Sequence, residues 1–541
     1  MTAINARRNI VIGLSLLALF LAIVIIGRDT GNSDNSSTVQ PTARPTLQPS
    51  GSPQLEAKVL FSIEPGWYEQ GQPIGLKVDA TQSSFMVRYT LDGTEPTMES
   101  ALFSNKIDLT SDVVIRARAY SDDGSAGPET IGMFGVGVKP TLPVYSIVAN
   151  PQQLWSDEEG IYVLGKNGNP SPPYKGANFW GNREIPVNVQ YFDEAGKIAY
   201  ESGAGMELFG GESRMQPQKS LELLAKKRYG AKRFDYRFFD SLKRKTFNNL
   251  ILRNGGQDFP LTHMRDSLSS LLAEPILSDV QSYRPVIVYL NGQYWGIHDL
   301  REKMDESLIS ARSGFSKKSI DLLESDGVVK AGDDRAFLEL MKVLESDEST
   351  EDTIANLISR IDVTSLFDYM IFEAYIGNTD WPDHNIRYWR SEEGDGKWRW
   401  LLYDADLSFG QADEPTLTRL MSSKLSRHPS VKVLQVLLLD EQMREQFLRR
   451  CGEILNGPLG KDKVISEIKA LQKKLEPEMG RHQTRWNGTL QGWEAEVNKL
   501  VAFADRRGDA MSLQIKKLFQ LSDEEMKAYG FATNHAGKGD E

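Results

Sequence analysis

The sequence predicts an α+β protein that carries a single transmembrane helix at its N-terminus. Three observations indicate this class. An apolar run opens the chain, residues 57–138 alternate hydrophobic and polar side chains as strands do, and residues 142–521 mix strands with a second half of helical periodicity. The expected order is therefore a membrane anchor, a small β-sandwich and a large mixed domain that ends in helices.

The composition limits the kinds of chemistry that the chain can perform. Its 541 residues include 63 Lys and Arg against 74 Asp and Glu, and the resulting net charge of −11 argues against nucleic acid as a partner. Cys451 is the only cysteine, which excludes an internal disulfide and a zinc site built on cysteines. We expect its thiol to be buried on a helix rather than reactive. With only six histidines, carboxylates, amides and lysines must carry most of the chemistry.

The first 27 residues are predicted to be a signal anchor. Ile10 to Gly27 is an 18-residue run without a charge, which at a rise of about 1.5 Å per residue is long enough to cross a bilayer. Arg7 and Arg8 precede it and should stay in the cytoplasm, which places the rest of the chain outside. The alternative is a cleaved signal peptide and a secreted protein, although no small-residue cleavage site follows the run.

The other predicted boundaries follow changes in composition. Residues 28–56 are rich in Ser, Thr and Pro and are predicted to be a linker. The β-sandwich is expected at 57–138 and the large domain at 139–530, and residues 531–541 are expected to form a disordered tail. The large domain is long enough to build a two-lobed core.

The small domain shows strand periodicity with turn signals. In VVIRARAY, Ile115, Ala117 and Ala119 point to one side, and the polar residues between them point to the other. YTLDGTEPT (Tyr89–Thr97) combines a strand with a tight turn and resembles the C-terminal domain of chitobiases and β-hexosaminidases. The resemblance implies an immunoglobulin-like accessory module, either one that contacts a cell-surface or cell-wall glycan or one that acts only as a spacer.

A pair of glycines precedes the first candidate for phosphate binding. Gly210 and Gly211 permit a tight turn, and Lys219 then enters a run in which Leu221 shares its face, as in a strand. A lysine that projects from a strand into a cleft can meet phosphate oxygens, and Arg214 is a second cationic candidate. A solvated strand lysine is the alternative interpretation.

A short helix is predicted from His263 to Glu274, with Thr262 as its N-cap. Asp266 lies in the first turn, where a carboxylate interacts favourably with the helix dipole. A second interpretation is that Asp266 or Asp258 orients Lys219.

Two apolar strands within residues 286–305 flank Asn291-Gly292, which is a strong hairpin signal. Glu302 follows the second strand, where the chain passes into its helical half. A junction between two lobes is a usual place for a ligand cleft, so Glu302 is a candidate site residue.

The most informative segment runs from Tyr375 to Gly410. Asp380 and Asn385 precede a predicted hairpin formed by IRYWR and KWRWLLY, and Asp404 and Asp406 follow it. Because the two ends of a hairpin lie at the same edge, we expect these side chains to converge. Carboxylate and amide oxygens suit Mg²⁺ or Mn²⁺, and Asp380 could accept a proton from an attacking hydroxyl.

The same segment is rich in aromatic residues. Trp381, Trp389, Trp398 and Trp400 could form a platform for a sugar or a base, but core filling of the hairpin is the preferred interpretation. His384 could be a ligand or an acid–base group, and a structural role is preferred for it as well.

The large domain resembles the spore coat protein H (CotH) kinase family, an atypical protein-kinase-like group. The resemblance spans nearly all of residues 142–521 and implies an atypical bilobed protein-kinase-like fold. It also includes HQTRW and FADRR in the helical end. The other matching motifs are, in chain order, QKSLEL (218–223), RNGGQDF (253–259) with MRDSL, YLNGQYWGIHDLRE (289–302), NTDWPDHN (378–385) and LLYDADLSFG (401–410).

The resemblance implies ATP and Mg²⁺ or Mn²⁺ as cofactors. The usual kinase signature GxGxxG is absent, which leaves phosphate binding to residues near Gly210–Arg214. The residues implied to bind or frame the nucleotide are Lys219, Arg214, Asp266 and Glu302, the implied catalytic residue is Asp380, and the implied metal ligands are Asn385, Asp404 and Asp406.

Three functions follow as hypotheses. The first is a membrane-anchored extracytoplasmic protein kinase that phosphorylates hydroxyls of envelope or coat-type proteins, with an unknown protein substrate. The second is a non-catalytic envelope or adhesion protein that uses an idle kinase-like domain and a glycan-binding β module. The third is a glycan hydrolase built on two carboxylates.

Overall fold

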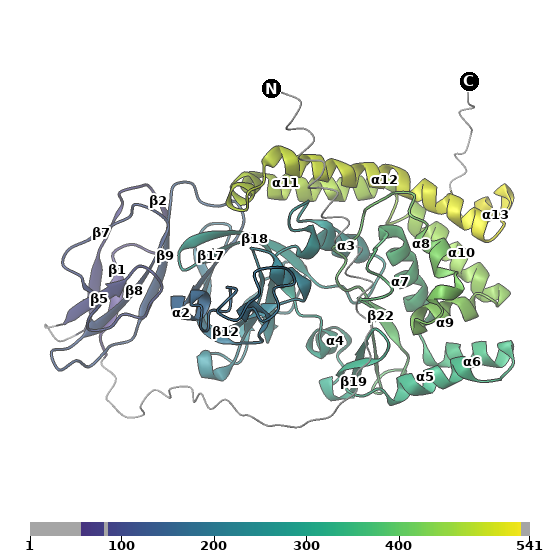
Figure 1. The fold of residues 1–541 in the computed structure, drawn as a ribbon, viewed down its shortest axis with the longest axis horizontal. Coiled ribbons are helices and arrows are strands. Elements are labelled where there is room, and N and C mark those ends of the chain that lie inside the picture. The colour runs from purple at the N-terminus through teal and green to yellow at the C-terminus, as the bar shows by residue number, and fades with distance from the viewer. Residues whose placement is uncertain (1–55, 81–84, 532–541) are drawn as a thin grey trace, which may run out of the picture. The chain divides into compact units, whose positions relative to one another are not determined.

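The computed structural model describes residues 56–80 and 85–531, which form a mixed α+β protein with a helical C-terminal part (Figure 1). The predicted anchor, the linker up to residue 55 and residues 532–541 of the predicted tail lie outside the described residues. Within the described ranges, no helix combines the length and the apolar character that crossing a bilayer requires.

The N-terminal β module is built from short strands, as its periodicity predicts. A five-stranded sheet has the order β2-β9-β8-β5-β6, and the pairs β1-β4 and β3-β7 complete a sandwich-like arrangement. Ile115, Ala117 and Ala119 of β8 are fully buried in its core, which confirms the predicted alternation. The strands are β1 (Lys58–Phe61), β2 (Gly66–Tyr68), β3 (Pro73–Ile74), β4 (Leu76–Asp79), β5 (Met86–Thr90), β6 (Ala101–Leu102), β7 (Ile107–Asp108), β8 (Val113–Tyr120) and β9 (Thr130–Val136).

A closed seven-stranded barrel follows, with the order β10-β11-β12-β13-β16-β18-β17 and a parallel pairing of β10 with β17 that closes it. Asn291 and Gly292, both with positive φ (49° and 76°), form the turn between β17 and β18, so the predicted hairpin is confirmed. The strands are β10 (Val144–Ala149), β11 (Ile185–Phe192), β12 (Ile198–Phe209), β13 (Ser220–Leu224), β16 (Asn249–Arg253), β17 (Tyr283–Leu290) and β18 (Gln293–Glu302); α2 (Pro151–Trp155) and the short pair β14 (Phe234–Asp235) and β15 (Thr246–Phe247) lie between them in sequence.

Strand alternation divides the barrel residues into two sets. Leu221, Leu252 and Leu300 lie at paired positions of β13, β16 and β18 and belong to the buried barrel core. The neighbouring pair, Arg253 of β16 and Asp299 of β18, therefore points to the opposite face. That face carries charge at strand ends, and it is where the candidate site forms.

The rest of the chain is mostly helical and includes a four-stranded sheet with the order β20-β19-β21-β22. Its helices α11 and α12 are long and run side by side (Figure 1). The elements are α3 (Arg265–Ala273), α4 (Glu306–Ser313), β19 (Ile320–Glu324), β20 (Val328–Ala331), α5 (Arg335–Glu345), α6 (Thr350–Arg360), α7 (Val363–Ile376), β21 (Arg387–Ser391), β22 (Arg399–Leu401), α8 (Thr416–Leu420), α9 (Pro429–Leu437), α10 (Glu441–Asn456), α11 (Lys461–Arg485), α12 (Leu490–Leu518) and α13 (Asp523–Ala528).

One local expectation about this part needs correction. The helix predicted over 263–274 begins later, at Arg265, with Met264 rather than Thr262 in the N-cap position. Further along, α9 and α10 are separate helices, and Asp440 accepts a hydrogen bond from the Met443 N–H and starts α10.

Other expectations are confirmed. The predicted strands on either side of residues 391–396 are β21 and β22, and Cys451 is fully buried on α10. The four tryptophans of the hairpin segment are each less than 5% exposed, so they fill the core rather than form a platform: Trp381, Trp389, Trp398 and Trp400.

Three of the six histidines form a buried cluster where the loop before α3, strand β18 and helix α11 meet. His263 and His482 have ring centroids 5.0 Å apart, and His482 Nδ1 accepts a hydrogen bond from the Ile297 N–H. Both ring nitrogens of His263 are buried without a partner among the described residues. Burial lowers the pKa of His263 to about 3 and that of His298 to about 4. The cluster is therefore neutral at physiological pH.

This cluster predicts an acid-sensitive fold. Below about pH 6.5 the histidines of the unfolded chain bind protons that the folded cluster cannot bind. The free energy of unfolding should therefore decrease as the pH is lowered, until the pH reaches the folded-state pKa. For His263 the expected loss between pH 7 and pH 5 is on the order of 2 kcal/mol. His263→Asn removes one titrating group and tolerates the φ of 58° at this position, so urea unfolding of this variant should show a flatter pH profile. A profile as steep as that of the wild type would contradict this account.

Candidate active site

The loop between α7 and β21 brings the first two predicted residues together. Asn385 Nδ2 donates a hydrogen bond to Asp380 Oδ2 over 2.8 Å and lies 3.4 Å from the backbone oxygen of Asp404. The hairpin thus joins its two ends as the sequence predicts. Asn385 and Asp404 both have left-handed backbone conformations, with φ of 62° and 56°. Such conformations are uncommon for residues other than glycine and cluster at functional sites.

Arg253, which sequence reasoning missed, links the two metal-ligand candidates. Its Nη2 donates a hydrogen bond to Asp406 Oδ2 over 2.7 Å and another to Asp404 Oδ1. Its Nε lies 3.4 Å from Asp266 Oδ2. The signal was present in NLILR, where the arginine follows alternating buried leucines at a strand end and must point away from the barrel core.

A glycine makes this close approach possible. Gly256 has a φ of 62°, and a Cβ at this position would overlap Asp406 Oδ2 and lie 2.8 Å from Arg253 Nη2. The next residue, Gln257, donates its backbone N–H to Asp406 Oδ2 over 2.9 Å. The RNGGQDF segment therefore wraps around the Asp406 carboxylate with its backbone.

Asp266 connects helix α3 to Arg253 and to the Asp404–Asp406 segment. Its Oδ2 accepts a hydrogen bond of 2.5 Å from Arg301 Nη1, and its Oδ1 accepts the Ala405 N–H over 3.0 Å. Burial would raise the pKa of Asp266, but the guanidiniums of Arg253 and Arg301 lower it below its usual range. Asp266 thus orients arginines rather than Lys219. Its proposed place in a nucleotide site stays a prediction.

Lys219 and Arg214 point elsewhere. The Lys219 ammonium donates hydrogen bonds to the carbonyls of Arg214 (2.6 Å) and Gln216 (3.0 Å) and lies 4.3 Å from the ring centroid of Phe179. Burial lowers its pKa to about 8. Arg214 donates to the Leu208 carbonyl over 2.9 Å. In the described chain neither side chain contacts the carboxylates around Arg253, and their predicted contact with phosphate remains untested.

Glu302 and Asp258 have structural partners. Glu302 accepts hydrogen bonds from Arg244 and from Arg312 (2.6 Å), in an ion-pair group at the end of β18 just before α4. Asp258 accepts the N–H groups of Met264 and Arg265 at 2.9 and 3.0 Å and so caps α3 instead of orienting Lys219. The predicted role of Glu302 towards a nucleotide remains untested.

The negative charges of Asp380, Asp404 and Asp406 favour a bound cation. Burial, together with the negative charges of Asp404 and Glu212, raises the pKa of Asp380. Burial and Asp404 also raise the pKa of Asp406. Glu212 belongs to the turn after Gly210 and Gly211, so that turn brings a carboxylate, not a positive charge, towards Asp380. A divalent cation would relieve the repulsion among these groups.

The donor set fits a hard cation that keeps part of its own shell. Asn385, Asp404 and Asp406 supply only oxygen donors, as Mg²⁺ and Mn²⁺ prefer. In the described part of the chain, no three His, Cys, Asp or Glu side chains are grouped so that they could hold a metal by themselves. A cation here would therefore complete its coordination with phosphate oxygens and water, as Mg²⁺ does in phosphoryl-transfer sites.

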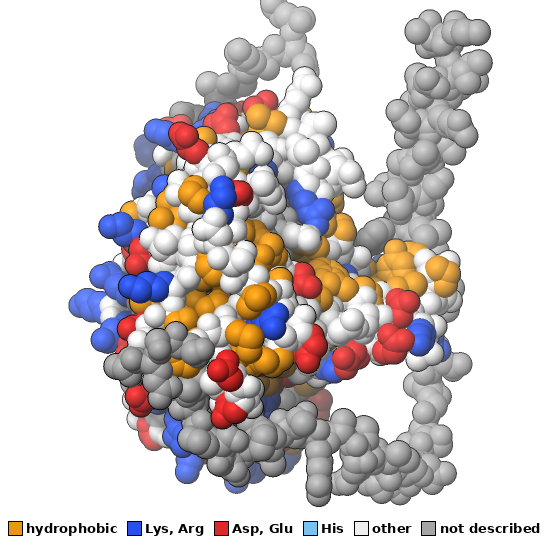
Figure 2. Space-filling model, turned by 90° about the vertical axis from the view of Figure 1, so that its left-hand side faces the viewer, with side chains coloured by type: hydrophobic (Ala, Val, Ile, Leu, Met, Phe, Trp, Pro, Cys, Tyr) orange, Lys and Arg blue, Asp and Glu red, His pale blue; other side chains and the backbone are white. Residues whose placement is uncertain are grey.

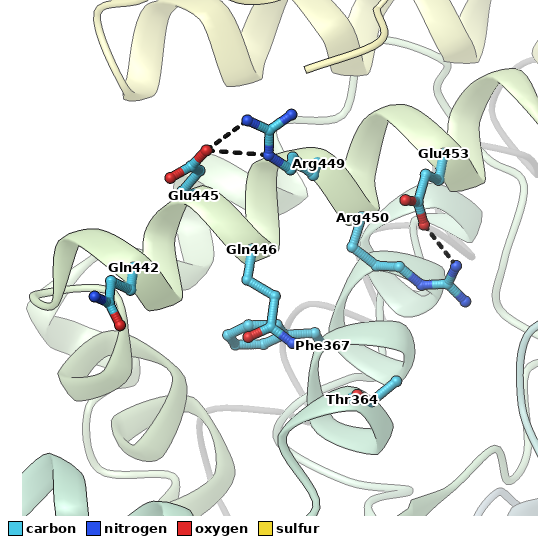
Figure 3. A pocket seen from close by; sticks show the side chains of 8 residues that line it. All are labelled: Thr364, Phe367, Gln442, Glu445, Gln446, Arg449, Arg450 and Glu453. Carbon is cyan, nitrogen blue, oxygen red and sulfur yellow. Dashed lines mark hydrogen bonds and ion pairs between the residues drawn. The ribbon is translucent and has the colours of Figure 1, made fainter. Parts of the chain in front are cut away.

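A separate pocket of about 620 Å³ lies on helix α10 against the start of α7 (Figure 3). Arg449 is paired with Glu445, and Arg450 with Glu453, so the charged side chains that line this pocket already neutralise one another. It contains none of the predicted site residues. We therefore assign the chemistry to the group around Asp404.

Comparison with known proteins agrees with both resemblances. The chitobiase/beta-hexosaminidase C-terminal domain matches residues 63–130. No curated protein matches the chain. The CotH kinase protein family matches residues 206–511, which is more than half of the chain and contains every predicted site residue. The chain therefore belongs to the CotH kinase protein family, and it carries a chitobiase/beta-hexosaminidase C-terminal domain in front of its kinase-like domain.

Proposed function

We propose that the protein is a metal-dependent protein kinase that transfers phosphate from ATP to hydroxyl groups of envelope or coat-type proteins. The observation that carries the proposal is the convergence of Asp380, Asn385 and Asp404 from the two ends of one hairpin. It places a candidate base beside candidate cation ligands, as phosphoryl transfer requires.

Asp380 would act as the base. The oxygen of the substrate hydroxyl attacks the γ-phosphorus of ATP, its proton passes to the Asp380 carboxylate, and the bond to the β-phosphate oxygen breaks to release ADP. A raised pKa makes Asp380 a better proton acceptor than an exposed aspartate. The hydrogen bond from Asn385 Nδ2 fixes the carboxylate in one orientation.

Asn385, Asp404 and Asp406 would hold the divalent cation. When bound, Mg²⁺ or Mn²⁺ supplies positive charge next to the phosphate oxygens. Lys219 and Arg214 donate hydrogen bonds to backbone carbonyls, and each has N–H groups left that could meet phosphate oxygens. Asp266 would keep α3 against the Asp404–Asp406 segment through the Ala405 N–H.

The proposed location is outside the cytoplasm, with the chain anchored by its N-terminal segment. The uncharged run from Ile10 to Gly27 behind Arg7 and Arg8 supports it. Fractionation of cells that produce the full chain, with protease added from outside, tests this part. A protein that is protected from the protease would contradict it.

The β module supports a second proposal, contact with a cell-wall glycan, because residues 63–130 match a domain of glycan-processing enzymes. Figure 2 shows hydrophobic side chains exposed between charged ones on one face of the molecule. Sugars usually stack on aromatic rings, but the large hydrophobic side chains most exposed in the described module are aliphatic: Leu60, Leu91, Leu102 and Val138. Such a contact would therefore rest on polar groups. Co-sedimentation with insoluble peptidoglycan or chitin tests it.

The kinase proposal predicts that Asp404→Asn lowers phosphate transfer by roughly a hundredfold or more, because one carboxylate of the cation site is lost. The measurement is ³²P transfer from γ-labelled ATP, with Mg²⁺ or Mn²⁺, to the protein itself and to casein. Asp413→Asn is the matched control, because Asp413 is exposed and outside the group. Absence of transfer by the wild type with either metal would overturn the proposal, as would full activity of Asp404→Asn.

A further inference from the structure

One nitrogen atom of Arg253 bonds both carboxylates that are proposed to hold the cation. Nη2 donates to Asp404 Oδ1 and to Asp406 Oδ2, the latter over 2.7 Å. The guanidinium is buried, with a side chain only 11% exposed, and Asp406 is similarly enclosed. This contact therefore fills the space between the two carboxylates with positive charge.

A divalent cation held by these same two oxygens would need the same space. Mg²⁺ binds its oxygen ligands at about 2.0–2.1 Å. A guanidinium nitrogen within hydrogen-bond distance of the same two oxygens cannot remain there, for reasons of both volume and charge repulsion. Arg253 and the cation are thus alternative partners of Asp404 and Asp406.

The structure also restricts where Arg253 can turn. Its Cα is fixed on β16, paired with Asp299 of β18, and its Nε is a buried donor without a hydrogen-bond partner among the described residues. Arg301 already bonds Asp266 Oδ2 at 2.5 Å, so a second guanidinium there would share that carboxylate. Asp299, which pairs with Arg253 across the strands, has one buried oxygen without a partner among the described residues. A bound nucleotide would offer a released Arg253 an unshared anion next to Asp404. Phosphate oxygens suit the planar fork of a guanidinium.

We propose that Arg253 exchanges partners during nucleotide binding: the cation takes Asp404 and Asp406, and the guanidinium passes to phosphate oxygens of the nucleotide. The inference rests on the proposed function and adds to it a positioning residue for the phosphates. In this exchange every charge keeps a counter-charge. The cation replaces the guanidinium at the carboxylates, and the phosphates replace the carboxylates at the guanidinium.

The exchange has a consequence that a purely structural ion pair lacks. A metal alone must displace Arg253 without offering it a new anion, so it binds weakly. ATP provides that anion, so nucleotide and metal should strengthen each other's binding. Removing the guanidinium should therefore tighten the binding of the metal alone while weakening the binding of ATP.

The experiment is titration calorimetry of the full chain with MnCl₂ alone and with ATP plus MnCl₂, for wild type, Arg253→Gln, Arg253→Lys and Arg450→Gln. For Arg253→Gln we expect Mn²⁺ alone to bind several-fold tighter and ATP with Mn²⁺ to bind roughly tenfold weaker, the usual loss for a charge-assisted hydrogen bond. Arg253→Lys keeps the charge and should retain part of the ATP affinity. Arg450→Gln removes a guanidinium paired with Asp368 on another helix and should change neither affinity.

Opposite results separate the inference from the kinase proposal. If Arg253→Gln weakens Mn²⁺ and ATP together while Arg450→Gln weakens neither, Arg253 only supports the site and the exchange is wrong. If ATP affinity is unchanged in both Arg253 variants, Arg253 does not contact phosphate. If the wild type binds no ATP with any metal, the proposed function itself fails. Thermal unfolding of each variant shows whether a loss reflects unfolding.

Discussion

Replacing Asp380 by asparagine should lower phosphate transfer by about 10²–10⁴-fold, the usual contribution of a positioned general base. The side chain keeps its shape and can still accept the hydrogen bond that Asn385 Nδ2 now donates to Oδ2. What the variant loses is the ability to take a proton. The affinity for ATP with Mn²⁺ should therefore stay close to that of the wild type while the transfer rate falls.

The same loop offers a matched control. Asp383 lies three residues after Asp380, but its carboxylate binds Arg427 and accepts from His428 Nε2 at 3.1 Å. Asp383→Asn therefore makes the same chemical change in the same loop without touching Asn385 or Asp404. Its transfer rate should remain near that of the wild type. If Asp380→Asn keeps more than a tenth of the rate, or Asp383→Asn loses as much, Asp380 is not the base.

Features that depend on short stretches of chain could be predicted. The turn at Asn291-Gly292 and the meeting of Asn385 with Asp404 follow from strand periodicity on both sides of one turn. The burial of the four tryptophans was likewise expected, because large rings in an apolar hairpin segment fill the core. The turn and the contact between Asn385 and Asp404 each join residues of one hairpin, so the local pattern was sufficient for them.

The direction of Lys219 could not be predicted, because strand periodicity says which residues share a face but not which face meets the cleft. Lys219 shares its face with Leu221, and Leu221 belongs to the barrel core. A strand offset by one residue would have placed it on the other face. The face turned towards Asp404 instead belongs to Arg253, 151 residues earlier in the chain. No local pattern encodes such a pairing, because it depends on how α3, the barrel and the hairpin pack together.

Charge and burial were also beyond the sequence. Asp404 and Asp406 look equivalent in LLYDADLSFG, yet the Asp404 side chain is 30% exposed and that of Asp406 is 9% exposed. The difference arises because the Gly256–Gln257 backbone closes over Asp406. The two carboxylates should therefore respond differently to mutation. Asp404 is the more accessible of the two, and Asp406 also holds two parts of the domain together.

Gly256→Ala tests that second role and should have the largest effect on stability. The added Cβ would overlap Asp406 Oδ2 and crowd Arg253 Nη2 at 2.8 Å, while the φ of 62° is unfavourable for alanine. The Asp406 carboxylate would have to leave both the Gln257 N–H and Arg253. Breaking a buried ion pair costs about 3–5 kcal/mol, so urea unfolding should show a loss of that order. Mn²⁺ binding in the presence of ATP should be lost with it.

Gly410→Ala is the control, because Gly410 lies four residues after Asp406 in the same segment and a Cβ there would meet no atom of the described residues within 4 Å. A double variant identifies the cause. Asp406→Ala removes the group that the new methyl would strike most closely and leaves only the end of the Arg253 side chain nearby, which can shift. Adding Gly256→Ala to it should therefore cost little more than the backbone strain, about 1–2 kcal/mol. Fully additive losses would show that Gly256 matters for a reason other than Asp406. A strongly non-additive pair would establish that this glycine is required because a carboxylate passes directly against its backbone.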